Sequence, residues 1–111
     1  MSQDLKWSPA EKAIARSAFD AALETTLSAL VADFKRKANA VTSASELWEI
    51  EDYLRQQRRE IDTTFDYRYS QLLLVFAQLI RQGRLDESRL DGLSGDKRED
   101  IRRMLSYFAR D

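Results

Sequence analysis

Phe19 to Val41 read FDAALETTLSALVADFKRKANAV, a stretch without Gly or Pro. Apolar residues recur in it every three or four positions, at Phe19, Leu23, Leu27, Leu30, Phe34, Ala38 and Val41. This spacing places them on one face of an α-helix, because a helix turns once in about 3.6 residues. The fold is therefore expected to be built around a long helix with one apolar stripe.

The start of this helix is marked by Ser8-Pro9-Ala10-Glu11. Ser8 suits the N-cap, Pro9 suits the first helical position, and Glu11 stands where a capping-box carboxylate belongs. The stretch 39–45 breaks the helix. We predict a first helix over about 9–40, which is about 48 Å long at about 1.5 Å per residue.

A second helix is predicted to follow directly. Ser43 and Glu46 form a second possible capping box, and Gly83 is a natural C-terminal stop with Arg81 in the last turn. Between them similar apolar spacing continues at Leu47, Ile50, Leu54, Ile61, Phe65, Leu72, Phe76 and Leu79, with lapses at Gln57 and Arg68. We predict one helix over about 44–82, about 58 Å long.

The remaining residues are expected to form a small C-terminal head. Residues 86–90 predict a short turn or helix, and Asp96 opens a last helix with Ile101, Met104, Leu105 and Phe108 on one face. Residues 72–80 are apolar on nearly all sides, which favours the core of this head over a groove for a partner. The prediction is one all-α domain over 1–111, with two long antiparallel helices forming a stalk at about 9–82 and a helical head at about 83–111.

Composition excludes several classes of function. The 111 residues include no Cys and no His, so a thiolate nucleophile, a disulfide, the usual general base and the commonest metal ligand are all missing. We therefore expect no enzyme activity, no metal and no cofactor. The formal net charge is −1, from 18 Lys+Arg against 19 Asp+Glu, which argues against a nucleic-acid partner.

Membrane insertion and secretion are not expected either. The longest apolar run, Leu72 to Ala77, is far shorter than the roughly 20 residues that a membrane span needs. Met1 to Asp4 lack a basic segment followed by an apolar stretch, so no secretory signal is expected. These features predict a cytoplasmic protein.

The lengths of the two helices favour an oligomer. A compact domain of this size has a radius of gyration near 13 Å, so helices of about 48 and 58 Å must project beyond it. A hairpin covers only one face of each helix, and the apolar surface that remains needs a partner. We expect a homodimer, since symmetric pairs are the commonest oligomers.

The segment 47–62 has an acidic first part and a basic centre. Glu51 with Arg55, Asp52 with Arg55, and Arg58 with Asp62 are neighbours at helical spacing, each pair contributing about 0.2–0.5 kcal/mol. These pairs are typical of a solvated, charged helix face. Trp48 does not fit that interpretation, because an indole among acids is either half-covered at a dimer interface or exposed as an anchor for a partner.

A further pattern over 43–83 resembles a known family. Leu47-Trp48 is followed by Asp52, Arg58, Glu60-Ile61-Asp62, Phe65-Asp66, Arg68, Val75-Phe76-Ala77-Gln78-Leu79 and Gly83. It is similar to the fluorescence recovery protein family of cyanobacteria, and a generic coiled coil would not reproduce it. The first helix and the tail match the family mainly in length and type.

The resemblance implies a non-enzymatic helical dimer that binds the photoactivated red form of the orange carotenoid protein, mainly through the C-terminal domain of that protein. It would speed the return to the resting orange form and detach the protein from the phycobilisome, near the cytoplasmic face of the thylakoid. Trp48, Asp52 and Arg58 would form the partner-binding surface. Leu47 would belong to the dimer interface, in which we also place Leu30, Phe34, Ile50 and Leu54.

Three positions depart from the pattern expected of the family. Glu51 stands where we expect His, Leu74 where we expect Phe, and Asp100 close to an expected Lys. The fold and the dimer can persist with these changes while partner recognition differs. The alternative is a dimeric helical adaptor of the same fold, with another protein partner, in a bacterium without the carotenoid protein.

Overall fold

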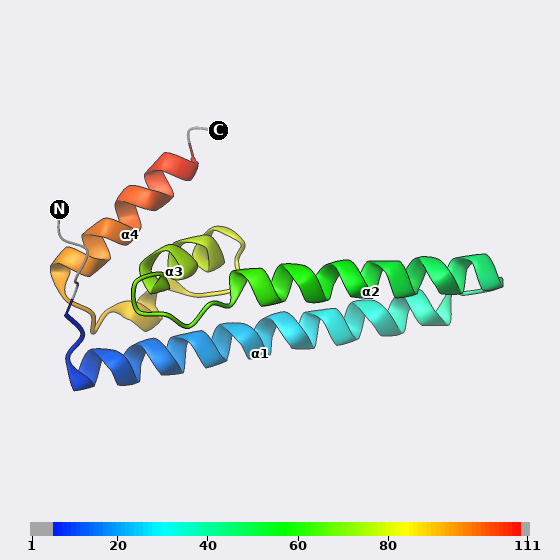
Figure 1. Cartoon of the computed structure of the whole chain (residues 1–111), viewed down its shortest axis with the longest axis horizontal. Helices are drawn as coiled ribbons and strands as arrows, with labels where there is room; N and C mark the ends of the chain where they lie inside the picture. Colours follow the sequence, from blue (N-terminus) through cyan, green and yellow to red (C-terminus); the bar gives the residue numbers. More distant parts are fainter. Residues whose placement is uncertain (1–5, 110–111) are drawn as a thin grey trace.

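The computed structural model describes residues 6–109 and is all-helical over that range (Figure 1). Its elements are α1 (Pro9–Asn39), α2 (Ala44–Thr64), α3 (Leu72–Arg81), the 3₁₀ helix η1 (Glu87–Leu90) and α4 (Gly95–Phe108). None of the helices within 6–109 has the length and hydropathy to cross a bilayer. The segment predicted to lack a secretory signal, residues 1–4, lies outside the described residues.

The predicted start of α1 is confirmed in detail. The Ser8 side chain accepts a hydrogen bond from the backbone N–H of Glu11 (3.1 Å), and the Glu11 carboxylate accepts one from the backbone N–H of Ser8 (3.0 Å). These two bonds satisfy donors that have no partner inside the helix. The helix then continues without interruption to Asn39, close to the predicted end.

The hairpin turn is also capped, although differently from the prediction. The Ser43 side chain accepts a hydrogen bond from the backbone N–H of Glu46 (3.2 Å), as an N-cap should. The Glu46 carboxylate bonds instead to Thr42, at 2.7 Å from its backbone nitrogen and 3.0 Å from its hydroxyl. α2 then runs back antiparallel to α1 (Figure 1).

The prediction of one continuous helix over 44–82 is wrong. α2 ends at Thr64, residues 65–71 form a loop, and α3 begins at Leu72. The loop is held by aromatic contacts with α1, because the ring of Phe19 lies edge-on to those of Phe65 and Tyr67, with centroids 5.3 and 4.9 Å apart. The hairpin therefore ends at residue 64, and α3 belongs to the head.

This break explains how the apolar segment 72–80 is enclosed. α3 packs against α4 and α1, so that Leu72, Phe76 and Leu79 are fully buried, as expected for the core of the head. α3 can approach α1 closely because the buried residues Ala15, Ala18 and Ala22 of α1 have small side chains. Gly92 lies close to this helix, and a Cβ there would be 2.3 Å from the Ile14 Cδ1 atom, so a larger residue would displace the end of that side chain.

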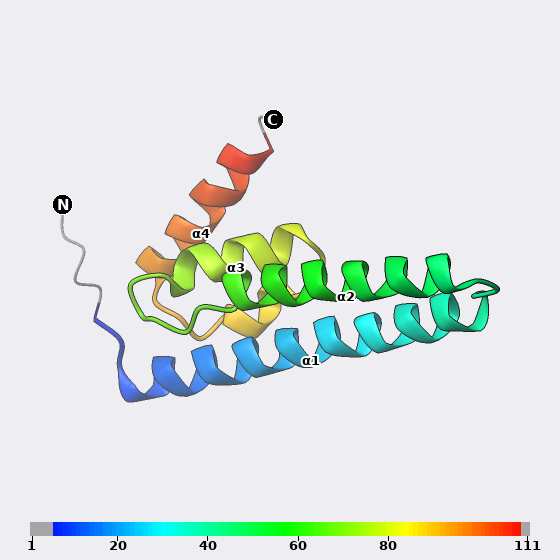
Figure 2. The same cartoon turned by 45° about the vertical axis from the view of Figure 1, so that its right-hand side comes forward.

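The hairpin projects well beyond the head (Figure 2). The described chain measures 54 × 30 × 21 Å, and its radius of gyration is 17.0 Å. A compact domain of this length has a radius of gyration near 13 Å. Two elongated helices thus leave the core and continue with only each other for cover.

Candidate functional site

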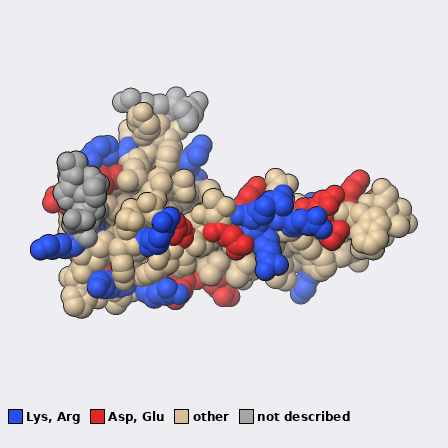
Figure 3. Space-filling view, viewed as in Figure 1, with Lys and Arg blue, Asp and Glu red and all other residues tan. Residues whose placement is uncertain are grey.

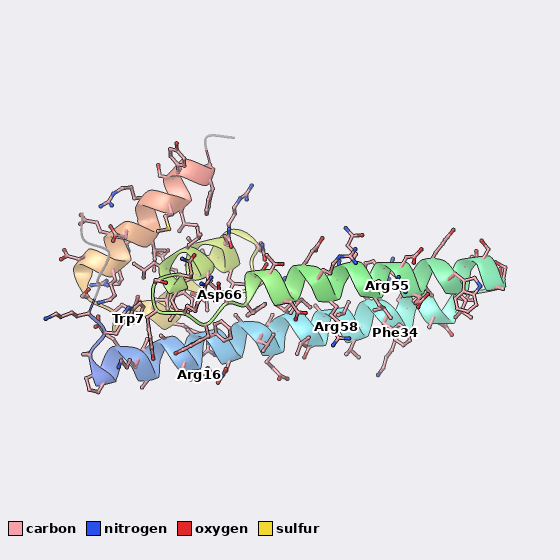
Figure 4. All side chains as sticks on the ribbon, in the orientation of Figure 1. Trp7, Arg16, Phe34, Arg55, Arg58 and Asp66 are labelled. Carbon is pink, nitrogen blue, oxygen red and sulfur yellow. The ribbon has the colours of Figure 1, made fainter. Side chains whose placement is uncertain are left out.

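The projecting part of α1 exposes an apolar stripe. Leu27, Val31 and Phe34 are 43%, 52% and 39% exposed. Their spacing places them on one face of the helix, and Figure 4 labels Phe34 on this part of the hairpin. Within residues 6–109 this stripe is only partly covered.

The five residues predicted for a dimer interface differ in how much of their surface is exposed. Leu47 on α2 is 50% exposed, and Phe34 lies in the exposed stripe of α1. Leu30 and Leu54 are half-buried in the hairpin. Ile50 is 9% exposed and has little surface left for a second chain. Phe34 and Leu47 are therefore the members of this set with the most apolar surface to offer.

Trp48 and Asp52 lie together near the hairpin turn. They are four residues apart on α2, so their side chains share a face, and both are exposed. The Trp48 indole is 60% exposed, and neither side chain has a hydrogen bond, ion pair or ring contact with another described residue. Taken as a single chain, the molecule presents Trp48 to solvent.

Arg58 lies apart from these two residues. It follows Trp48 by ten positions, which corresponds to about 15 Å along the helix and a rotation of about 80° around it. It is exposed, and the predicted ion pair with Asp62 is absent from the described residues. Among the predicted pairs Glu51–Arg55 does form, at 2.8 Å. The predicted partner-binding residues therefore make an extended surface rather than one compact site.

The charges along this surface alternate in sign. In Figure 3 basic side chains gather over the middle of the hairpin, with acidic ones on both sides of them. Near the turn, hydrogen bonds from the Thr42 backbone and hydroxyl lower the pKa of the Glu46 carboxyl, which keeps this group charged. Such a surface is suited to a protein that bears charges of both signs.

The opposite face of the hairpin is polar and was not anticipated from the sequence. The Tyr53 hydroxyl donates a hydrogen bond to the Asp33 carboxylate, which also pairs with Arg36. Below them lies an open trough of about 530 Å³, lined by Thr26, Tyr53, Gln57, Glu60, Ile61, Thr64, Phe65, Gln82 and Arg84. Asp33 is 20 residues from Tyr53, so helical spacing within either helix carries no signal for this link.

A cavity on the head was also missed. It has a volume of about 550 Å³ and lies between α3 and α4, lined by Leu74, Asp100, Arg103, Met104, Tyr107 and Phe108. Two of its lining residues, Arg103 and Asp100, form an ion pair with each other (2.7 Å). Two of the three positions that depart from the family pattern, Leu74 and Asp100, thus line the same cavity. No group of acidic residues within 6–109 is arranged to hold a metal ion.

Comparison with known proteins shows to which family this architecture belongs. Residues 7–105 match the model of the photoprotection regulator fluorescence recovery protein. The chain belongs to the fluorescence recovery protein family. This is a family of photoprotection regulators and not a known enzyme family.

Individual members agree with this membership. The fluorescence recovery protein of Synechocystis sp. (strain PCC 6803) is 35% identical over 96 residues, which cover 86% of this chain and 88% of that protein. The solved structure of the Fremyella diplosiphon fluorescence recovery protein is 38% identical with a TM-score of 0.86, over 92% of this chain and 99% of that one. The Synechocystis structure, at 34% identity, has the same TM-score and coverage. The predicted fold class is confirmed.

Proposed function

We propose that this protein binds the photoactivated orange carotenoid protein through the C-terminal domain of that protein and accelerates its return to the resting orange form. The carotenoid protein would thereby be detached from the phycobilisome. Membership of the family over 7–105 supports this proposal, and so does the exposed Trp48 beside Asp52. Tryptophan dominates many binding hot spots because it contributes a large apolar area together with a polar edge.

The mechanism requires no chemistry from this chain. A regulator shifts the equilibrium toward the compact arrangement if it binds that arrangement more tightly than the open one. It accelerates the return if it binds the path between the two more tightly than the open arrangement. Equal affinity for both forms would leave the equilibrium unchanged. An extended helical surface without catalytic groups is sufficient for this role.

We also propose that the working form is a homodimer. The stripe formed by Leu27, Val31 and Phe34, together with Leu47, is the apolar surface that a second copy would cover. Burial of apolar surface contributes about 25 cal/mol per Å², so covering these side chains favours association. In a cyanobacterial host we expect this dimer in the cytoplasm, near the cytoplasmic face of the thylakoid.

The direct test is the decay of the red form in the dark. Photoactivated orange carotenoid protein is mixed with this protein, and the absorbance change from red to orange is timed. We expect acceleration by the parent chain and a clear loss of acceleration with Trp48→Ala, Asp52→Asn or Arg58→Ala. Asp62→Asn and Arg59→Ala are matched controls, because they change the same residue types at exposed positions of the same helix. No acceleration at several-fold molar excess of the parent chain would disprove the proposal.

One observation favours a second candidate function. Leu74 and Asp100 line the head cavity and differ from the residues expected there, so this cavity would suit another protein partner. A dimeric helical adaptor of the same fold is then the alternative. A host genome without a carotenoid-protein gene, together with an unaccelerated decay, would favour it.

A further inference from the structure

Two charged side chains are buried where the head meets the start of α1. Glu11 is 7% exposed and Lys97 is 5% exposed, although they are 86 residues apart in the chain. The Lys97 Nζ atom lies 3.3 and 3.4 Å from the two Glu11 carboxylate oxygens. The backbone N–H of Ser94, the N-cap of α4, also donates to Glu11 at 2.8 Å. One carboxylate therefore joins the first turn of α1 to the first turn of α4.

The segment Lys6–Trp7 closes over this pair. The Lys97 ammonium donates to the Lys6 carbonyl oxygen (2.5 Å) and lies 5.0 Å from the centroid of the Trp7 ring. The Trp7 ring also contacts Tyr69 of the 65–71 loop, with centroids 5.4 Å apart. Within residues 6–109 its buried Nε1 atom has no hydrogen-bond partner, so the ring is held by packing and by the Lys97 charge. Figure 4 shows Trp7 between the first turns of α1 and α4.

The position of α4 also shapes the head cavity. Five of the six residues that line the cavity belong to α4, and Leu74 of α3 is the sixth. α4 packs mainly on α3, and its first turn is joined to α1 through Glu11. Because α3 also packs on α1, a shift of α4 away from both of these helices would change how far the cavity opens beside Leu74.

We propose that Lys6 and Trp7 form a strap that holds α4 against α1 and so sets the opening of the head cavity. The physical basis is that a buried ammonium needs its partners. If Glu11 loses its charge, Lys97 becomes an uncompensated buried charge and must be hydrated. If Trp7 is removed, the ion pair remains, but water reaches the Lys97 ammonium because the ring no longer covers it. Lys97 lies in the first turn of α4, so hydration of its side chain moves this end of the helix away from α1.

The absence of cysteine makes this movement directly measurable. Spin labels can be attached at two exposed positions, Ser17→Cys in α1 and Ser106→Cys in α4. Pulsed electron paramagnetic resonance then measures the distance between the two labels, and hence between the two helices. Labelled chain is diluted with excess unlabelled chain, so that distances between copies do not contribute. With Glu11→Gln or Trp7→Ala we expect a longer and broader distance distribution than in the parent chain.

Three comparisons make the outcome decisive. Glu99→Gln changes an exposed acid on α4 and should leave the distribution unchanged. Labels on Ser17→Cys and Ser45→Cys, at opposite ends of the hairpin, should keep a narrow distribution in every variant. If Glu11→Gln does not fold, as judged by circular dichroism, Trp7→Ala decides, because it leaves the ion pair in place. The proposal would be overturned if the Ser17–Ser106 distance distribution were unchanged in Trp7→Ala. It would also be overturned if the distributions of both label pairs broadened equally.

Discussion

The hairpin and the head use apolar residues in opposite ways. In the head, Leu72, Phe76, Leu79, Leu90 and Ile101 are at most 1% exposed, whereas the only buried apolar residue within 23–64 is Ile50, at 9% exposed. The hairpin nevertheless carries Leu27, Val31, Phe34, Leu47 and Trp48, all at least 39% exposed. The head thus stabilises itself, while the outer hairpin offers surface for other chains. Stability thus rests mainly on the head, and the surfaces proposed for interaction lie mainly on the hairpin.

The largest expected effect compares two phenylalanines. Phe76→Ala empties a fully buried position of the head and should lower the free energy of unfolding by about 3–5 kcal/mol. Phe34→Ala removes a side chain that is 39% exposed and should cost clearly less in a monomer. Urea unfolding of both variants measures the difference. Equal losses at high protein concentration, which become unequal on dilution, would indicate that a second copy covers Phe34.

The next effect concerns association. Leu47→Glu places a charge at an exposed apolar position of the hairpin, and burying it unpaired in an interface would cost several kcal/mol. We expect monomers by sedimentation velocity, with the helix content of the parent chain. Gln56→Glu, also on an exposed site of α2, is the control that should leave dimers intact. Dimers that persist in Leu47→Glu would remove this residue from the interface.

Acid should weaken the head through Glu11. The pKa of the Glu11 carboxyl lies below its ordinary value of 4.5, mainly because the backbone N–H of Ser8 donates a hydrogen bond to it. Hydrogen bonds from Ser94 and Lys97 lower the pKa further, whereas burial of the carboxyl raises it. Because the pKa is lower in the folded state, the ionised group stabilises the fold above pH 4.5, and this contribution is lost as the pH falls through the lowered value.

Unfolding curves recorded at a series of pH values check this expectation. The loss of stability between neutral and acidic pH should be smaller in Glu11→Gln than in the parent chain, since that side chain does not titrate. Asp62→Asn, at an exposed site on the hairpin, should leave the parent profile unchanged. Identical profiles for Glu11→Gln and the parent would show that Glu11 does not link stability to pH.

The smallest effect is expected on the exposed face of α2. Arg55→Ala breaks the ion pair with Glu51, in which both side chains are more than half exposed. Pairs of this kind contribute about 0.3–0.5 kcal/mol and are screened by salt. Thermal unfolding at low and high salt should show a small loss that nearly vanishes at high salt. A loss as large as that of Phe76→Ala would mean that the hairpin face is structural.

The sequence predicts best what is determined locally. The start of α1 follows from Ser8, Pro9 and Glu11, and the length of the helix follows from apolar spacing without Gly or Pro. The break at 65–71 was missed because these residues include neither Gly nor Pro, and because Phe65 and Tyr67 contact Phe19, more than 40 positions earlier. The lapse of the stripe at Arg68 was the available local signal.

The same limit applies to the candidate site. Trp48 could be singled out because an indole among acids is conspicuous in a single helix, and the structure leaves it exposed. The head cavity depends on how α4 packs beside Leu74, which lies 26 positions before Asp100. The Lys6–Trp7 strap depends on Lys97, which lies about 90 positions later. Pairings over such distances leave no periodic pattern in the chain.

The two tryptophans have a practical consequence. Trp7 is half-buried beside Tyr69 and Lys97 in the head, and Trp48 is exposed near the turn of the hairpin. Indole fluorescence responds to its surroundings, so Trp48→Phe leaves an emission from the head alone, and Trp7→Phe leaves one from the hairpin alone. The chain thereby carries two separate fluorescent reporters, one in the head and one in the hairpin, without any added dye.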